Sequence, residues 1–103
     1  MFLTGVTGSA PDGTMPSKPD VQIRAAFEKI KEVLRHGGLS CAALVEMTSY
    51  HIGIDQHFDL FSRIRAEYVK EPYPAWTALE VAGLRRAGAI VEIRAIASLE
   101  PET

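Results

Sequence analysis

The sequence predicts an α+β fold in which one β-sheet carries two helices on a single face, with its elements in the order β-α-β-α-β-β. Apolar residues recur at helical spacing in two segments, residues 23–34 and 58–68. Shorter stretches around these segments show the alternation or the β-branched content of strands. The 103 residues fit one domain, residues 1–103, which would bury roughly two-thirds of the surface its unfolded chain exposes.

The composition is that of an ordinary globular protein and argues against several classes of partner. The net charge of −2 gives no electrostatic reason to expect a nucleic acid or an anionic membrane. The single Cys41 excludes an intrachain disulfide and suits a reducing compartment. There is no apolar run of about 20 residues and no signal-peptide pattern at the N-terminus. We therefore expect a cytoplasmic protein.

The first half of the chain should form a strand, residues 2–6, and then a long helix. Ser17 offers a hydroxyl cap, Pro19 suits the first turn, and Asp20 is an acid three residues after the cap. The pair Gly37-Gly38 is expected to end this helix. Its apolar stripe consists of Ile23, Phe27, Ile30 and Leu34.

A central strand is expected next, over residues 42–52, followed by a second helix that Asp55 can cap. Alternation gives the strand one face with Val45, Met47, Ser49 and His51, and another with Leu44, Glu46, Thr48, Tyr50 and Ile52. The second helix should point Phe58, Phe61, Ile64 and Tyr68 inward.

Two strands joined by a turn near Gly88, residues 75–84 and 90–99, are expected to form a hairpin at the end of the chain. One face of the last strand is purely apolar: Val91, Ile93, Ala95, Ala97 and Leu99. The other mixes charge with aliphatic groups: Ile90, Glu92, Arg94 and Ile96. With both helices on one side, this mixed face would be left uncovered, and symmetric self-association is the simplest way to bury it.

Two separated segments of the chain resemble the Rid proteins (the RidA/YjgF family), many of which carry the labels endoribonuclease L-PSP or translation initiation inhibitor. The family's P-A-R-[ST]-x-V-x-V segment reads Pro74-Ala75-Trp76-Thr77-Ala78-Leu79-Glu80-Val81 here, and its [VIL]-E-I-[ED]-A-[IV]-A segment reads Val91-Glu92-Ile93-Arg94-Ala95-Ile96-Ala97. Upstream, Gln22, Arg24, Phe27, Glu28, Ile30, Val33 and Leu34 fit its Q-x-R-x-x-[LF]-x-N-[IV]-x-x-[VI]-L helix, with Lys29 in place of the usual Asn.

This resemblance implies a chorismate-mutase-like fold and a homotrimer with ligand clefts between subunits. It also implies hydrolysis of reactive imines and enamines to ketones and ammonia, with no cofactor and no metal. In the family a glutamate and the P-A-R arginine serve this chemistry. The glutamate is kept as Glu92, whereas the arginine position holds Trp76, and Gly5 stands where the family has an SGQ glycine. A family hairpin with a cleft tyrosine is missing before this point, so we expect a short member or a start codon placed downstream.

Two interpretations of Trp76 remain open from the sequence. In one, the indole walls an altered cleft beside Glu92 and stacks on a planar ligand. In the other, it fills the volume left by the arginine and the missing hairpin. In either case the loss of a bidentate guanidinium should weaken binding of an α-imino acid by about 1.5–3 kcal/mol, or one to two decades. A general 2-imino-acid deaminase is therefore not expected.

Glu92 and Arg94 lie two residues apart on one strand face and also allow two interpretations. The favoured one is a structural ion pair, which would lower the pKa of the Glu92 carboxyl and make it a weaker base. Alternatively, Arg94 replaces the missing cation and binds substrate. Tyr50 and Ala78 are further candidates for bordering the cleft, although core packing explains Tyr50 equally well.

The remaining polar residues give weaker signals. His51 and His57 have no recognised metal spacing, and a surface or packing role is favoured for both. Cys41 is expected to be an inert, half-buried thiol. The pair Arg85-Arg86 should be solvated in a turn, and the Gly5-x-x-Gly8 segment lacks the helix that a phosphate-binding loop requires.

The sequence thus favours a Rid-like homotrimer that binds a small, planar or less acidic metabolite between subunits and possesses imine or enamine hydrolase activity. The alternative is a binding or structural homologue without catalysis. An endoribonuclease or translation inhibitor ranks third, because the chain has no basic stripe and no aromatic platform for RNA.

Overall fold

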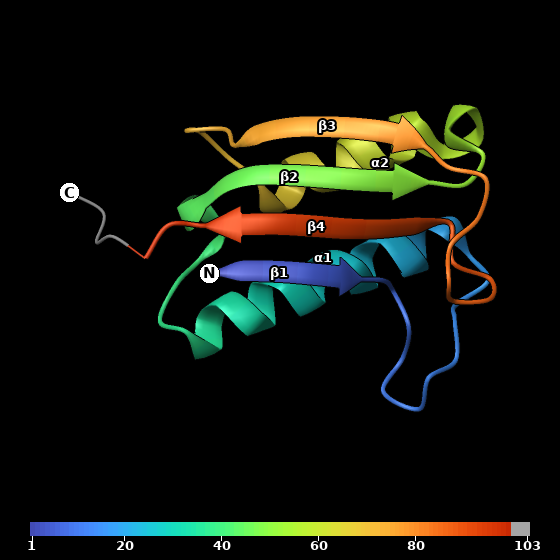
Figure 1. Cartoon of the computed structure of the whole chain (residues 1–103), viewed down its shortest axis with the longest axis horizontal. Helices are drawn as coiled ribbons and strands as arrows, with labels where there is room; N and C mark the ends of the chain where they lie inside the picture. Colours follow the sequence, from blue (N-terminus) through green and yellow to red (C-terminus); the bar gives the residue numbers. More distant parts are fainter. Residues whose placement is uncertain (100–103) are drawn as a thin grey trace.

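A computed structural model describes residues 1–99 and places two helices side by side behind a four-stranded sheet (Figure 1). This α+β architecture confirms the predicted fold class and the predicted order of the elements. The elements are β1 (Phe2–Val6), α1 (Pro19–His36), the 3₁₀ turn η1 (Cys41–Ala43), β2 (Leu44–His51), α2 (Ile54–Tyr68), β3 (Ala75–Glu80) and β4 (Val91–Ala97).

The strand order is β1-β4-β2-β3, so the hairpin predicted between the last two strands is wrong. β3 is parallel to β2 and lies at the edge of the sheet, whereas β4 is antiparallel to both β1 and β2 and lies between them. The helical connection from β2 to β3 explains this order, because it returns the chain alongside β2 in the same direction. The following segment, residues 81–90, then crosses to the centre of the sheet instead of forming a tight turn.

Both helices begin differently from the sequence prediction. Lys18 precedes the first residue of α1, no side chain caps that end, and Ser17 is not the cap. α2 begins directly after Gly53, whose φ of +63° is readily adopted by glycine, and not at an Asp55 cap. The predicted end of α1 is confirmed: Gly37 follows its last residue, and Gly38 has a φ of +76°.

The hydrophobic core lies between the helices and one face of the sheet. α1 contributes the predicted stripe, and Phe27 contacts both Phe61 and Tyr68 of α2, with ring centroids 5.5 and 5.2 Å apart. The sheet contributes Met47 and the apolar face of β4, Val91, Ile93, Ala95 and Ala97, all buried.

The inward face of β2 is confirmed for Met47, Ser49 and His51, which are all buried. Val45 is an exception and is 49% exposed. The pairing of β2 with β4 shifts by one residue between Leu44 and Glu46, so Leu44 takes the core position instead.

Candidate functional site

The face of the sheet that turns away from the helices carries three of the predicted site residues. Glu92 is paired in register with Tyr50, and Arg94 with Thr48, so these four side chains form two cross-strand pairs on β4 and β2. All four are half-buried. A carboxylate, a phenol and a guanidinium are therefore close neighbours on a surface that no helix covers.

Glu92 and Arg94 form no ion pair with each other, which contradicts the interpretation favoured from the sequence. Within residues 1–99, neither side chain has an ion-pair or hydrogen-bond partner. Side chains two apart on a strand point the same way, but the strand rise separates them by about 6.6 Å at their Cα atoms. Both charges thus remain free to interact with a ligand or a second chain.

Trp76 lies on the opposite face of the sheet from Glu92. It pairs with Met47 and points toward α2, where its ring stacks on Phe58 at a centroid distance of 5.7 Å and an interplanar angle of 5°. The guanidinium carbon of Arg65 lies 4.2 Å from the centre of the same ring. These contacts support the volume-filling interpretation of Trp76, and within one chain its indole and the Glu92 carboxylate lie on opposite faces of the sheet.

Burial of Arg65 against the indole lowers the pKa of its guanidinium, and its Nε atom is buried without a hydrogen-bond partner. Ala78 pairs in register with Ser49 and so also faces the helices. Of the six predicted site residues, the structure therefore gathers Glu92, Arg94 and Tyr50 on the open face, whereas it places Trp76 and Ala78 on the other.

A buried chain of hydrogen bonds links Trp76 to two histidines. The Nε1–H of Trp76 donates to the Ser49 hydroxyl oxygen at 2.9 Å. The same oxygen lies 2.8 Å from His51 Nε2, and His51 Nδ1 lies 3.0 Å from His57 Nε2. All these contacts are satisfied if the Ser49 hydroxyl donates to His51 and His51 Nδ1–H donates to His57.

This chain confirms a packing role for His51 and His57, while the alternative of a surface position is wrong, because both are buried. Burial, and then the neighbouring His57, lower the pKa of His51 to about 4; burial also lowers the pKa of His57. Both rings are therefore neutral near pH 7. Alternation along β2 places Ser49 and His51 on one face, and this was the sequence signal for their contact. The contact of His51 with His57 depends on where α2 begins, which the sequence did not show.

Gly5 lies on β1, at the other edge of the sheet from Trp76. Its φ of +64° falls where the pairing of β1 with β4 is irregular. It lines a groove of about 370 Å³ together with Ser9, Lys29 and Arg86. The sequence prediction had not included these last three residues in a site, because their charges and hydroxyls come from three distant segments.

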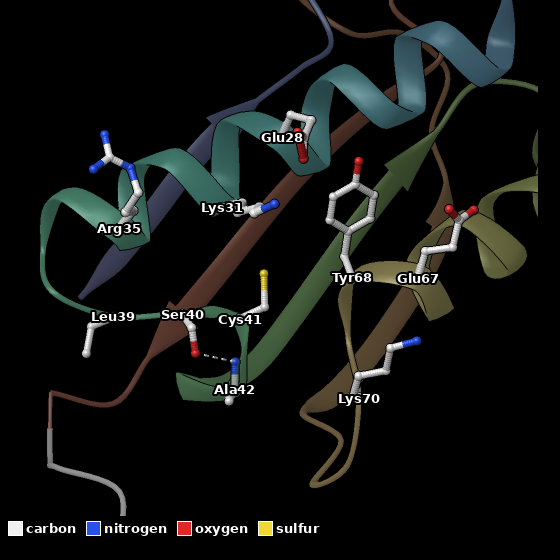
Figure 2. A pocket seen from close by; sticks show the side chains of 10 residues that line it. All are labelled: Glu28, Lys31, Arg35, Leu39, Ser40, Cys41, Ala42, Glu67, Tyr68 and Lys70. Atoms are coloured by element: carbon white, nitrogen blue, oxygen red, sulfur yellow. Dashed lines mark hydrogen bonds between the residues drawn. The ribbon is translucent and has the colours of Figure 1, made fainter.

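A second groove, of about 620 Å³, runs between the C-terminal parts of α1 and α2 (Figure 2). Its charged walls are largely engaged: Arg35 pairs with Glu32, and Glu67 binds Arg24 through both carboxylate oxygens. The Cys41 thiol points into this groove, and burial raises its pKa, which disfavours the reactive thiolate. Cys41 is thus half-buried and weakly nucleophilic, as predicted.

Residues 1–99 have neither a cluster of metal-ligating side chains nor a helix that could span a membrane. Residues 1–99 contain no cluster of three or more His, Cys, Asp or Glu side chains arranged to hold a metal ion. Neither helix in this range is long and apolar enough to cross a membrane.

Comparison with known proteins identifies the family. The family model described as Endoribonuclease L-PSP matches residues 1–99. The chain is 32% identical over 100 residues to the RutC family protein YjgH of Escherichia coli K12, covering 96% of this chain and 75% of that protein.

Solved structures show the same similarity in three dimensions. The structure of protein YjgH matches with a TM-score of 0.88 at 31% identity, covering 98% of this chain and 77% of the other. RidA from the Antarctic bacterium Psychrobacter sp. matches with a TM-score of 0.87 at 26% identity, covering 95% and 79%. The structure of E. coli TdcF with bound serine matches with a TM-score of 0.86 at 25% identity, covering 96% of this chain and 80% of the other. The chain therefore belongs to the Endoribonuclease L-PSP family, which is the RidA/YjgF family that its sequence motifs resemble.

Proposed function

We propose that this chain is a small-molecule-binding Rid protein that hydrolyses a small imine or enamine at the open face of its sheet, with Glu92 as the base. The single observation that carries this proposal is the unpaired Glu92 carboxylate, half-buried between Tyr50 and the free Arg94 on an uncovered surface. A carboxylate without a cationic partner in its own chain is available to hydrogen-bond a water molecule or a ligand.

The reaction requires little from the protein. Glu92 accepts a proton from water while the water oxygen forms a bond to the imine carbon, and it passes this proton to the imine nitrogen to give a neutral carbinolamine. Glu92 then accepts the carbinolamine O–H proton and delivers it to the amine nitrogen as the C–N bond breaks, so that a carbonyl compound and ammonia leave and the carboxylate is restored. Tyr50 borders this position on β2, and Arg94 is the cation available to bind a substrate carboxylate.

The relative with a bound serine supports a ligand of amino-acid size. E. coli TdcF, 25% identical to this chain, holds serine in its structure. We propose a ligand that carries a carboxylate and a C=N group, bound more weakly than in relatives with the P-A-R arginine, because Trp76 stands in its place and faces α2.

We also propose that the site is completed by self-association into a trimer. The open face exposes Phe2 and Leu79 beside the polar group. Glu92, Tyr50 and Arg94 lie on a face that no helix of the same chain covers, and an adjacent copy could enclose them. Sedimentation equilibrium tests this step; a monomer at all accessible concentrations would contradict it.

The catalytic proposal is tested by generating imines in place with an amino-acid oxidase and measuring the rate of ammonia release. We expect Glu92→Gln to lower the rate at least about tenfold, and Arg94→Met to raise the apparent KM for imino acids. Glu46→Gln is the matched control, since Glu46 is an exposed carboxylate on the same face, four residues before Tyr50 on β2. Equal rates for wild type and Glu92→Gln would remove Glu92 from the mechanism.

A binding protein without catalysis is the second candidate, and the replacement of the family arginine by Trp76 favours it. In that case none of the imines generated by the oxidase would be hydrolysed faster with the protein than in buffer alone. A small amino acid such as serine would still bind. The family label of endoribonuclease ranks last, because the two histidines that could serve as an acid–base pair are buried and neutral.

A further inference from the structure

Two cationic side chains line the same two grooves at the β1 edge of the molecule, together with Glu32, and Glu28 lines the larger groove. Lys29 of α1 and Arg86 of the segment before β4 line the groove of about 370 Å³ and also an adjoining groove of about 690 Å³. Ser9, from the segment that follows β1, lines both grooves as well. Three segments that are distant in the sequence thus converge on one surface.

Neither cation has an anionic partner within residues 1–99. Glu32 lines both grooves, but its carboxylate is bound by Arg35, at 2.6 and 3.1 Å, and lies 3.2 Å from His36. Burial, and then the charge of Arg86, lower the pKa of Lys29. The two cations therefore repel each other in the free protein, and a bound anion would relieve this repulsion.

Hydroxyl groups complete the arrangement behind the lysine. Lys29 Nζ donates to the Ser9 hydroxyl oxygen at 2.8 Å, and the Thr7 hydroxyl donates to the same oxygen at 3.4 Å. A hydroxyl can donate one hydrogen bond as well as accept, so Ser9 is able to donate to a ligand in the grooves that it lines. Thr7 and Ser9 are both buried, so their positions are fixed by the fold.

We propose that Lys29, Arg86 and Ser9 form a binding site for the phosphate group of a small molecule. An ammonium, a guanidinium and a hydroxyl that approach from separate segments suit a tetrahedral dianion with several acceptor oxygens better than a planar carboxylate. Lys29 is also the position at which this chain departs from the asparagine of the family's helix pattern, so the site is a feature of this chain.

This inference does not rest on the proposed hydrolase activity. The site is formed by α1 and two loops at the sheet edge, whereas Glu92 and Arg94 point from the open face of β4. Gly5 lines the smaller groove, so a ligand held here would extend along β1. Phosphate binding and imine hydrolysis can accordingly fail separately.

The test is an NMR titration of the ¹⁵N-labelled protein with inorganic phosphate near pH 7.5, at constant ionic strength maintained with chloride. We expect saturable shifts of the Thr7, Gly8 and Ser9 amides and weaker binding of acetate. Arg86→Met and Lys29→Met should each weaken phosphate binding at least about tenfold, because each removes a charge-assisted hydrogen bond.

Arg85→Met and Lys31→Met are the matched controls, since both lie near the changed residues in sequence but line neither groove. Both should bind phosphate as the wild type does. Arg86 is exposed, so Arg86→Met decides the question even if Lys29→Met does not fold. The proposal is overturned if phosphate causes no saturable shift up to about 10 mM, if Arg86→Met binds it equally well, or if acetate binds as tightly as phosphate.

Discussion

The two faces of the sheet use polar side chains in opposite ways. On the face covered by the helices, Trp76, Ser49, His51 and His57 are joined in one hydrogen-bonded chain inside an apolar core. On the open face, Glu92 and Arg94 have no partner within residues 1–99, and Phe2 is 71% exposed. Polar groups on the covered face thus contribute to folding, whereas those on the open face are available for binding.

The largest expected effect is on stability, and it should distinguish an aromatic ring buried on the helix side of the sheet, Phe61 of α2, from one on the open face, Phe2. Phe61→Ala should lower the free energy of unfolding by about 3–5 kcal/mol, because Phe61 is fully buried and contacts Phe27, His51 and Trp76. Phe2→Ala should change it by less than about 0.5 kcal/mol in the monomer. Urea unfolding at low protein concentration measures both.

The same pair of variants probes self-association at higher concentration. If a second copy covers the open face, Phe2→Ala should weaken the oligomer in sedimentation experiments without affecting the folded monomer. A loss of several kcal/mol from Phe2→Ala in the monomer would show that the two faces do not differ in the way described.

Acidification should destabilise the covered face through its histidines. The pKa of His51 is lowered to about 4 in the folded state, from the ordinary value near 6.5 in the unfolded chain. Between these values the unfolded chain binds more protons, so stability is complete above pH 6.5 and falls as the pH drops toward 4. The contribution of His51 to this loss should approach about 3 kcal/mol at and below pH 4, measured as the free energy of unfolding against pH.

Two variants show whether the buried pair is the cause. His51→Gln should flatten the decline between pH 6.5 and 4, whatever its effect at pH 7. His36→Gln should leave the decline unchanged, because His36 is exposed at the end of α1. An equally steep decline in His51→Gln would assign the effect to other groups.

Smaller losses should follow from interrupting the buried chain at two points. Ser49→Ala removes the oxygen shared by Trp76 and His51 and leaves two buried groups without partners, which should cost about 2–3 kcal/mol. Trp76→Phe removes one donor but keeps an aromatic ring beside Phe58, so it should cost less, about 1–2 kcal/mol. Denaturant unfolding measures the free energy lost in each variant. A larger loss for Trp76→Phe than for Ser49→Ala would contradict the role of Ser49 as the shared hydrogen-bond partner.

Much of the fold could be predicted because the residues that face the core recur in the sequence at the spacing of helices and strands. The stripe of α1 and the alternation of β4 correctly predicted these elements and their buried sides as far as Ala97, whereas Leu99, predicted on the same buried face, lies beyond β4 and is 69% exposed. The pairing of the strands could not be obtained in this way, since alternation says which side of a strand is buried but not which strand lies beside it. Helix starts were missed at Ser17 and Asp55 because a capping residue type is compatible with several positions.

The candidate site was predictable only where it follows from alternation along one strand. Glu92 and Arg94 were correctly placed on one face, but their predicted ion pair is absent. The position of Trp76 was open because its direction depends on the parallel register with Met47, a contact across 29 residues. The meeting of Lys29 with Arg86 depends on how two loops pack against α1, and no local pattern carries that information.

The smallest expected effect on stability is at Glu92 itself. Because its carboxylate makes no ion pair or hydrogen bond within residues 1–99, Glu92→Gln should change the free energy of unfolding of the monomer by less than about 0.5 kcal/mol. Urea unfolding at low protein concentration measures this, with Ser49→Ala as the contrasting variant on the covered face. A loss above about 1 kcal/mol would mean that Glu92 stabilises the fold, and a stabilising partner would then limit it as a base. An unchanged free energy of unfolding, combined with a lower rate of ammonia release, would show that Glu92 serves the reaction and not the fold. The open face of the sheet would then carry the chemistry, and the covered face the stability.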